Sequence, residues 1–151
     1  MRELTIHFDE SLAFELENIR PLSRVVGLYF IFTRNTEIQY PFGKSKLLYI
    51  GMSERATNSI SRRLSGHFDG TSRNLGLSNY KKIDELLFTF ISFEMLRPFW
   101  PFRVEDLESY FILDFVHKWG VYPICNNKSG TEVDSDKLSV EFKIDWEYFQ
   151  E

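Results

Sequence analysis

The sequence predicts an α+β fold in which a small central sheet of three strands is flanked by helices, with extra strands at the two termini. Apolar runs near residues 25–33 and 46–52 have the two-residue period of strands. Two stretches, about 57–68 and 102–118, space their apolar residues as helices do. With 151 residues and 43% apolar content, the chain is long enough for one compact domain.

The two ends of the chain alternate between apolar and polar residues. Residues 3–9 alternate and predict a short half-buried strand, followed by a helix that Asp9 or Ser11 caps and Pro21 ends. Residues 139–146 alternate strictly and predict a final strand. The sequence leaves open whether the two terminal strands pair.

Two tripeptides, each with one glycine and one tyrosine in reverse order, lie in the first two core strands. The first ends in Tyr29 and the second begins with Tyr49. If the strands pair, a period of two puts both phenols on one side of the sheet. Gly27 and Gly51 on the same face leave room for a ligand or another backbone. We therefore expect a site at these tyrosines.

The segments between these elements carry further predictions. Residues 86–95 are apolar on both faces, as expected for a central strand covered on both sides. Residues 34–45 include Pro41 and Gly43 and form a link that is long for a hairpin. Residues 69–82 are rich in Gly, Ser and Asn and predict an exposed basic loop.

The first long helix is expected to start at a cap, either Thr57 or Asn58. At 100° per residue, Arg62 lies on the side opposite the apolar stripe and should face solvent. Arg63 and His67 lie at the boundary of that stripe, one turn apart, and should be neighbours. A charged head at such a boundary can point inward along the sheet.

The second long helix places a carboxylate close to its apolar stripe. Glu108 lies about 20 to 40° from the centre of that stripe. An ionised Glu that is buried without a partner costs several kcal/mol, so it must be protonated, paired or bound to a cation. Two interpretations stay open: a structural Glu108 bonded to a tyrosine or to Arg63, and a functional carboxylate.

Charge is distributed unevenly along the chain, whose net charge is −4. Residues 34–82 hold nine Lys and Arg against three acids, which is +6, so the remainder carries −10. This basic block, residues 34–82, contains Tyr49 and has basic residues on both sides of it. It is either a phosphate-binding surface or a solvated basic loop region.

Cysteine and histidine usage limits the other classes of site. Cys125 is the single cysteine, which excludes an internal disulfide, and three histidines do not favour a structural zinc site. No uncharged apolar run is long enough to cross a bilayer, and the first residues lack a secretory pattern. We expect a soluble, cytoplasmic protein.

Over residues 25–127 the pattern resembles the GIY-YIG nuclease domain family. The motifs that carry the resemblance are Gly27-Leu28-Tyr29, Tyr49-Ile50-Gly51, Arg63-Leu64-Ser65-Gly66-His67, Leu107-Glu108, and Pro123 with Asn126. Leu28 replaces the commoner Ile, and the stretches after Gly51 and after residue 68 are longer than in many members. The resemblance implies one domain, 1–151, with an antiparallel three-stranded sheet in a nuclease-like core and extensions at 1–24 and 128–151.

The resemblance also implies an activity, namely metal-dependent hydrolysis of DNA phosphodiester bonds by an endonuclease of restriction, mobile-element or structure-specific type. The cofactor would be Mg²⁺, or another divalent cation such as Mn²⁺, held by Glu108. The implied catalytic residues are Tyr29, Tyr49, Arg63, His67, Glu108 and Asn126. The expected DNA-binding residues are Lys44, Lys46, Ser53, Arg55, Arg62, Arg73, Lys81 and Lys82. A homodimer or a partner subunit would help to recognise the target.

Two other functions are compatible with the sequence. One is a catalytically inactive DNA-binding module on the same type of fold. The other is an acidic interaction protein without nucleic acid, which depends only on the negative charge outside residues 34–82.

Overall fold

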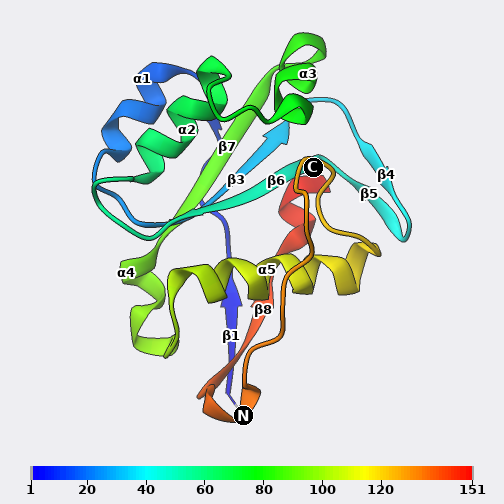
Figure 1. The fold of residues 1–151 in the computed structure, drawn as a ribbon. Coiled ribbons are helices and arrows are strands. Elements are labelled where there is room, and N and C mark those ends of the chain that lie inside the picture. Colours follow the sequence, from blue (N-terminus) through cyan, green and yellow to red (C-terminus); the bar gives the residue numbers. More distant parts are fainter. Residues whose placement is uncertain (1, 151) are drawn as a thin grey trace.

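The computed structural model describes residues 2–150 and has a mixed α+β architecture built on a four-stranded antiparallel sheet (Figure 1). The strand order is β2-β7-β3-β6. The strands are β2 (Leu12–Ala13), β3 (Gly27–Thr33), β6 (Leu47–Ser53) and β7 (Leu86–Ser92). The prediction of three core strands is wrong by one, because the short β2 pairs with the outer side of β7. Two residues are too few to show an alternating pattern in the sequence.

The centre of the sheet is β3, which pairs with β6 on one side and with β7 on the other. β7 is also an inner strand, paired with β2 on one side and β3 on the other, so the prediction of a central strand within residues 86–95 is confirmed. β7 lies next to the edge and ends at Ser92, where α4 (Phe93–Leu96) begins. The first four residues of β7 are all buried because layers cover both faces of the sheet there.

The helices follow the sequence expectation only in part. The remaining helices are α1 (Leu16–Ile19), α2 (Ile60–Asp69), α3 (Leu75–Ile83) and α5 (Val104–Trp119). Ser59 caps α2, because its hydroxyl accepts a hydrogen bond from the Arg62 N–H at 3.3 Å, so the predicted caps at Thr57 and Asn58 are wrong. The predicted N-terminal helix shrinks to the four-residue α1, with Glu15 at its N-cap. No helix within residues 2–150 combines the length and apolar character that a membrane span requires.

Helix α3 occupies most of the segment that was predicted to be a basic loop. Asn74 caps it by accepting a hydrogen bond from the Leu77 N–H at 3.1 Å. Leu77 is the buried residue that attaches the helix to the core. One buried residue among Gly, Ser and Asn leaves almost no helical periodicity in the sequence, which explains the error.

The link between β3 and β6 is a regular hairpin of β4 (Ile38–Tyr40) and β5 (Gly43–Ser45). The hydroxyl of Tyr40 donates to the Leu47 carbonyl at 2.7 Å, which fastens the hairpin to β6. The link that is long for a simple hairpin turn therefore holds two extra strands, which the sequence did not predict.

The termini meet in a second, parallel pair made by β1 (Arg2–Ile6) and β8 (Val140–Ile144). This result answers the question of terminal pairing that the sequence left open. Phe142 of β8 packs edge-on against Tyr110 of α5, so the pair extends below that helix (Figure 1). The 3-10 helices are η1 (Arg20–Leu22), η2 (Arg97–Phe99), η3 (Ser135–Lys137) and η4 (Trp146–Gln150).

The two faces of the central sheet carry different layers. Tyr29 pairs with Gly51 and Ile31 pairs with Tyr49 across β3 and β6, so both tyrosines lie on one face, as predicted. His67 of α2 contacts the Tyr29 ring on this face. Phe30 points to the opposite face, where Phe111 of α5 packs on it. Helices α1 and α2 thus lie on one side of the sheet and α5 on the other (Figure 1).

The free edge of β6 is covered by the segment that follows α5. The Asn126 side chain accepts a hydrogen bond from the Ile50 N–H at 3.0 Å and donates to the Ile50 carbonyl at 2.9 Å. The Cys125 N–H donates to the Leu48 carbonyl at 2.8 Å. These bonds satisfy the outward polar groups of β6 next to Tyr49.

Candidate active site

Tyr29 is the innermost polar residue of the candidate site, with 0% of its surface exposed. Its ring crosses over Gly51 on the neighbouring strand, and a Cβ atom at position 51 would collide with that ring. Gly27 has a φ of +151° and lies against the Ile91 carbonyl, so a side chain there would collide with backbone. Gly27 therefore allows the close backbone approach that the sequence predicted, whereas the space at Gly51 is filled by the Tyr29 ring instead of a ligand or another backbone.

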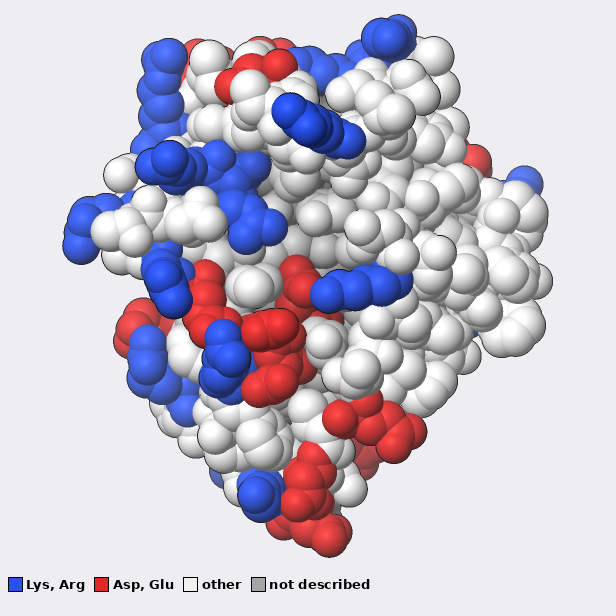
Figure 2. All heavy atoms as spheres, in the orientation of Figure 1, with Lys and Arg blue, Asp and Glu red and all other residues white. Residues whose placement is uncertain are grey.

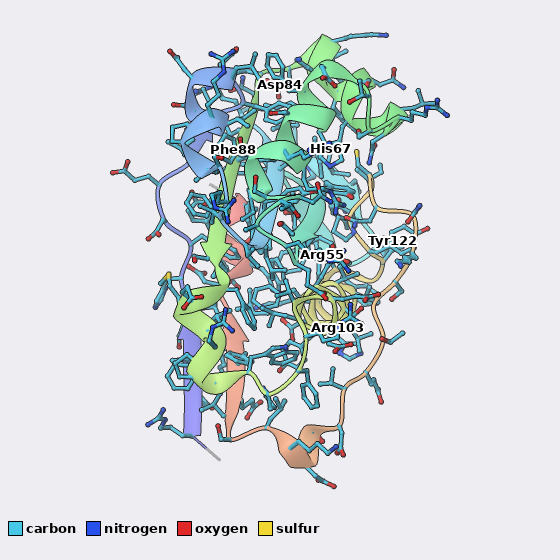
Figure 3. The ribbon with its side chains drawn as sticks, turned by 60° about the vertical axis from the view of Figure 1, so that its left-hand side comes forward. Arg55, His67, Asp84, Phe88, Arg103 and Tyr122 are labelled. Atoms are coloured by element: carbon cyan, nitrogen blue, oxygen red, sulfur yellow. The ribbon has the colours of Figure 1, made fainter. Side chains whose placement is uncertain are left out.

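A hydrogen-bonded chain leads from Tyr29 towards the surface. The Tyr29 hydroxyl lies 3.0 Å from Nε2 of His67, and Nδ1 of His67 lies 2.7 Å from the Ser72 hydroxyl. Ser72 reaches His67 because α2 ends at Gly70, whose φ of 86° reverses the chain. Figure 3 shows His67 on α2 beside the sheet. Since Ser72 is exposed, the chain connects a buried phenol with solvent.

Tyr49 stands between Tyr29 and the outside of the molecule. Its ring centroid lies 6.1 Å from that of Tyr29 and 5.0 Å from that of His67. The side chain is half-buried and lines the groove described below. Burial raises its pKa, the charge of Glu108 raises the pKa further, and the Arg63 guanidinium acts in the opposite direction.

The charges of Arg63 and Glu108 act in opposite directions on the pKa values of both tyrosines. Arg63 is half-buried, whereas Arg62 is exposed, as the helical angles predict. Burial raises the pKa of Glu108 to about 7, while Arg63 and Lys128 pull that pKa back down. The Glu108 charge also raises the pKa of Tyr29, and Arg63 lowers it.

The protonation states at neutral pH follow from burial. Burial raises the pKa of Tyr29 well above its ordinary value of 10.0, so the residue stays a phenol. Burial, reinforced by the Arg63 charge, lowers the pKa of His67 to about 4, so its ring is neutral. A phenol can donate its proton to Nε2 while Nδ1–H donates to Ser72. The hydrogen-bonded chain of Tyr29, His67 and Ser72 can therefore transfer a proton outward.

Glu108 has no compensating hydrogen bond from the part of the chain that is described, residues 2–150. The interpretation of Glu108 as a structural residue bonded to a tyrosine or Arg63 therefore lacks its expected bond. Within the same residues, no three His, Cys, Asp or Glu side chains converge to surround a metal ion. A cation at Glu108 would draw most of its ligands from substrate and water, as Mg²⁺ commonly does.

A groove of about 680 Å³ opens beside Tyr49 and His67. Three arginines line it, Arg62, Arg63 and Arg73, and among residues 2–150 no acidic residue does, Glu108 included. Its other lining residues are Asn58, Gly66, Thr71, Ser72, Asn74, Leu75, Cys125 and Asn127. Figure 2 shows Lys and Arg concentrated in the upper half of this face, over α2 and α3, and acidic residues lower, over α5. The groove therefore suits an anionic ligand.

The other predicted DNA-binding residues lie away from this groove. Ser53 is fully buried, and its hydroxyl bonds the Arg55 and Asn58 carbonyls, so it holds the loop before α2. Lys81 donates to the Phe68 carbonyl at 2.7 Å at the end of α2. The remaining four do not line the groove: Lys44, Lys46, Arg55 (labelled in Figure 3) and Lys82.

Asn126, predicted as a catalytic residue, lies at the edge of the sheet with both polar atoms of its amide bonded to Ile50. Such an Asn126 positions the strand that carries Tyr49. Sequence reasoning missed Ser72, Asn74 and Lys128. Only Gly70, a typical helix stop, hinted at the turn that brings Ser72 to His67.

Comparison with models of known protein families, with curated proteins and with solved structures found no match in any of the three.

Proposed function

We propose that this chain is a metal-dependent endonuclease that hydrolyses DNA phosphodiester bonds, the activity that its resemblance to the GIY-YIG nuclease domain family implies. One observation carries the proposal. Tyr29, Tyr49 and His67, chosen from the sequence alone, contact one another. Arg63 lines the groove beside them, and the charge of Glu108 acts on both tyrosines.

The proposed metal ligand is Glu108. Its carboxylate is half-buried, has no hydrogen bond within residues 2–150, and has a pKa raised by burial to about 7. A bound cation would relieve the cost of ionising this group, and carboxylate oxygen is a ligand that Mg²⁺ prefers. When bound, the cation would polarise the phosphodiester and neutralise charge on the leaving oxygen.

Tyr49, Tyr29 and His67 together would remove a proton from the attacking water. Tyr29 has none of its surface exposed, so Tyr49, which lines the groove, would take the water's proton while passing its own to Tyr29. Tyr29, a weak base because burial raises its pKa, would at the same time pass its proton to Nε2 of His67. Nδ1–H of His67 would then donate its proton to Ser72, and Ser72 would pass one to solvent. Each group in this chain gains one proton and loses one.

Arg63 would stabilise the negative charge that develops on the phosphorus oxygens. Its guanidinium is half-buried beside Tyr49 and lines the groove, where a planar fork of donors can clamp phosphate. Arg62 and Arg73 would hold neighbouring phosphates and give affinity that falls steeply with salt. One domain of this size has little room for target recognition, so a second copy or a partner subunit is part of the proposal.

A plasmid-nicking assay tests the proposal. Wild-type protein should nick supercoiled plasmid with Mg²⁺ and stop when the metal is chelated. Glu108→Gln keeps the shape but not the charge, and should lower nicking by at least about 100-fold while DNA binding persists. Glu105→Gln is the matched control, because Glu105 is an exposed residue on the same helix. Equal nicking by the two variants would remove Glu108 from the chemistry.

The two neighbouring arginines provide a second comparison in the same assay. Arg63→Ala should lower turnover by about 100- to 1000-fold. Arg62→Ala should weaken binding and keep turnover at saturating DNA, because Arg62 is exposed. Equal losses of turnover would show that the wrong arginine was assigned.

A catalytically inactive DNA-binding module is the second candidate function. The observation that favours it is the raised pKa of Tyr29, which makes the phenol a weak base. It predicts salt-sensitive DNA binding in the groove without nicking under any divalent cation. Metal-dependent nicking that Glu108→Gln abolishes would exclude it.

A further inference from the structure

One exposed apolar side chain lies in the cationic groove. Leu75, the first residue of α3, is 75% exposed and lines the groove with Arg62, Arg63 and Arg73. The large apolar side chains exposed within residues 2–150 are Phe42, Leu75, Ile83, Met95 and Ile124. Leu75 alone among these five lines the groove. Leu75 is therefore distinguished by its position in the cationic groove and not by its exposure.

Hydrogen bonds of the preceding residue fix the backbone position of Leu75. Asn74, directly before it, donates to the Cys125 carbonyl at 3.0 Å and accepts from the Leu77 N–H at 3.1 Å. Cys125 in turn bonds the backbone of β6 through Leu48. Leu75 is therefore held at a defined position relative to the sheet that carries Tyr49.

The chemistry around Leu75 restricts what it can contact. Arginines bind phosphates, and an apolar side chain gains nothing from phosphates because they are strongly hydrated. The base faces are the large apolar surfaces of DNA, but in an intact duplex stacking covers them and leaves only the thymine methyl groups of the major groove for an apolar contact. Apolar side chains reach base faces where bases are unstacked.

We propose that Leu75 packs against an unstacked base while the groove arginines hold the adjoining phosphates, so that the preferred ligand is DNA with locally unpaired bases. The inference rests on the proposed function and refines its substrate class. It makes Leu75 a residue that determines specificity for DNA structure, independent of the proton chain at Tyr29.

Fluorescence anisotropy with chelator present tests the inference, because binding is then measured without cutting. The probes are a labelled duplex and the same duplex with a central run of mismatches. Wild-type protein should bind the mismatched probe about tenfold more tightly, and Leu75→Ala should lose about fivefold of that preference. Leu75 is exposed, so its truncation leaves the fold intact.

Two matched variants make the result specific. Ile83→Ala removes a side chain that is 70% exposed at the other end of the same helix, and should keep the wild-type preference. Arg73→Ala should weaken binding to both probes by the same factor, as phosphate contacts do. An unchanged preference in Leu75→Ala, or a wild-type protein that binds both probes equally, overturns the inference alone. If neither probe binds, the proposed function fails with it.

Discussion

Adjacent residues of β3 face two different environments. Tyr29 and Phe30 both have 0% of their surface exposed. Phe30 packs against aromatic rings, among them Phe8, Phe111 and Phe149. The Tyr29 hydroxyl bonds a neutral imidazole, and the charges of Arg63 and Glu108 act on it.

The difference shows how one strand can serve both stability and chemistry. Burial of apolar rings stabilises the fold by about 25 cal/mol per Å² removed from water. Burial of a phenol and a carboxylate costs free energy, and their perturbed pKa values record that cost. The phenylalanine face therefore compensates for the tyrosine face. Separate measurements of stability and turnover should distinguish the two.

The largest expected effects come from the two adjacent residues themselves. Phe30→Ala should lower the free energy of unfolding by about 3–5 kcal/mol because it leaves a cavity among packed rings. Tyr29→Phe should lower it by only about 1 kcal/mol, the worth of one hydrogen bond, but reduce nicking by at least about 100-fold. Urea unfolding and plasmid nicking measure the two quantities. A Tyr29→Phe protein that nicks at the wild-type rate would contradict the division between the faces.

The pH dependence of stability should reveal the charge of Glu108 on α5. Folding raises the pKa of Glu108 from 4.5 to about 7, so between these values the folded protein keeps a proton that the unfolded chain releases. Without metal, the contribution of Glu108 to the free energy of unfolding is complete below about pH 4.5 and is lost as pH rises through about 7. Allowing for partial exposure, the loss should be about 1–2 kcal/mol.

Urea unfolding in chelator across this pH range measures the loss as the difference between wild type and Glu108→Gln, since other carboxylates titrate equally in both. Added Mg²⁺ should restore stability to the wild type alone. Parallel pH profiles of stability for the two proteins would show that folding does not raise the pKa of Glu108.

The smallest effect is expected at the outer end of the proton chain. Ser72→Ala removes the partner of Nδ1 in His67 and should lower turnover by about fivefold with little change in DNA affinity. Ser72→Thr keeps a hydroxyl and should recover most of the turnover. If nicking rates of Ser72→Ala and wild type coincide at every pH, the proton leaves by another route.

Helical and strand periodicity predicted the parts of the site that lie on regular elements. The exposure of Arg62, the half-burial of Arg63 and the shared face of Tyr29 and Tyr49 all follow from fixed angles per residue. The unusual position of Glu108 followed from the same count, and its raised pKa agrees with it.

Parts that depend on non-periodic backbone could not be predicted. Ser72 reaches His67 through a turn with left-handed Gly70 and Arg73, whose φ is 62°. Helix α3 was missed because a single buried Leu77 leaves no apolar stripe. The short β2 and the parallel pairing of β1 with β8 are long-range contacts, which local patterns do not encode.

The amide of Asn126 has a consequence for self-association. An unpaired edge strand is a template on which another copy of a chain can add its own strand and begin a fibril. Here a single side chain occupies both polar groups of Ile50, so the edge beside Tyr49 offers no free ladder at that point. The same amide that steadies the strand also keeps neighbouring molecules from extending the sheet.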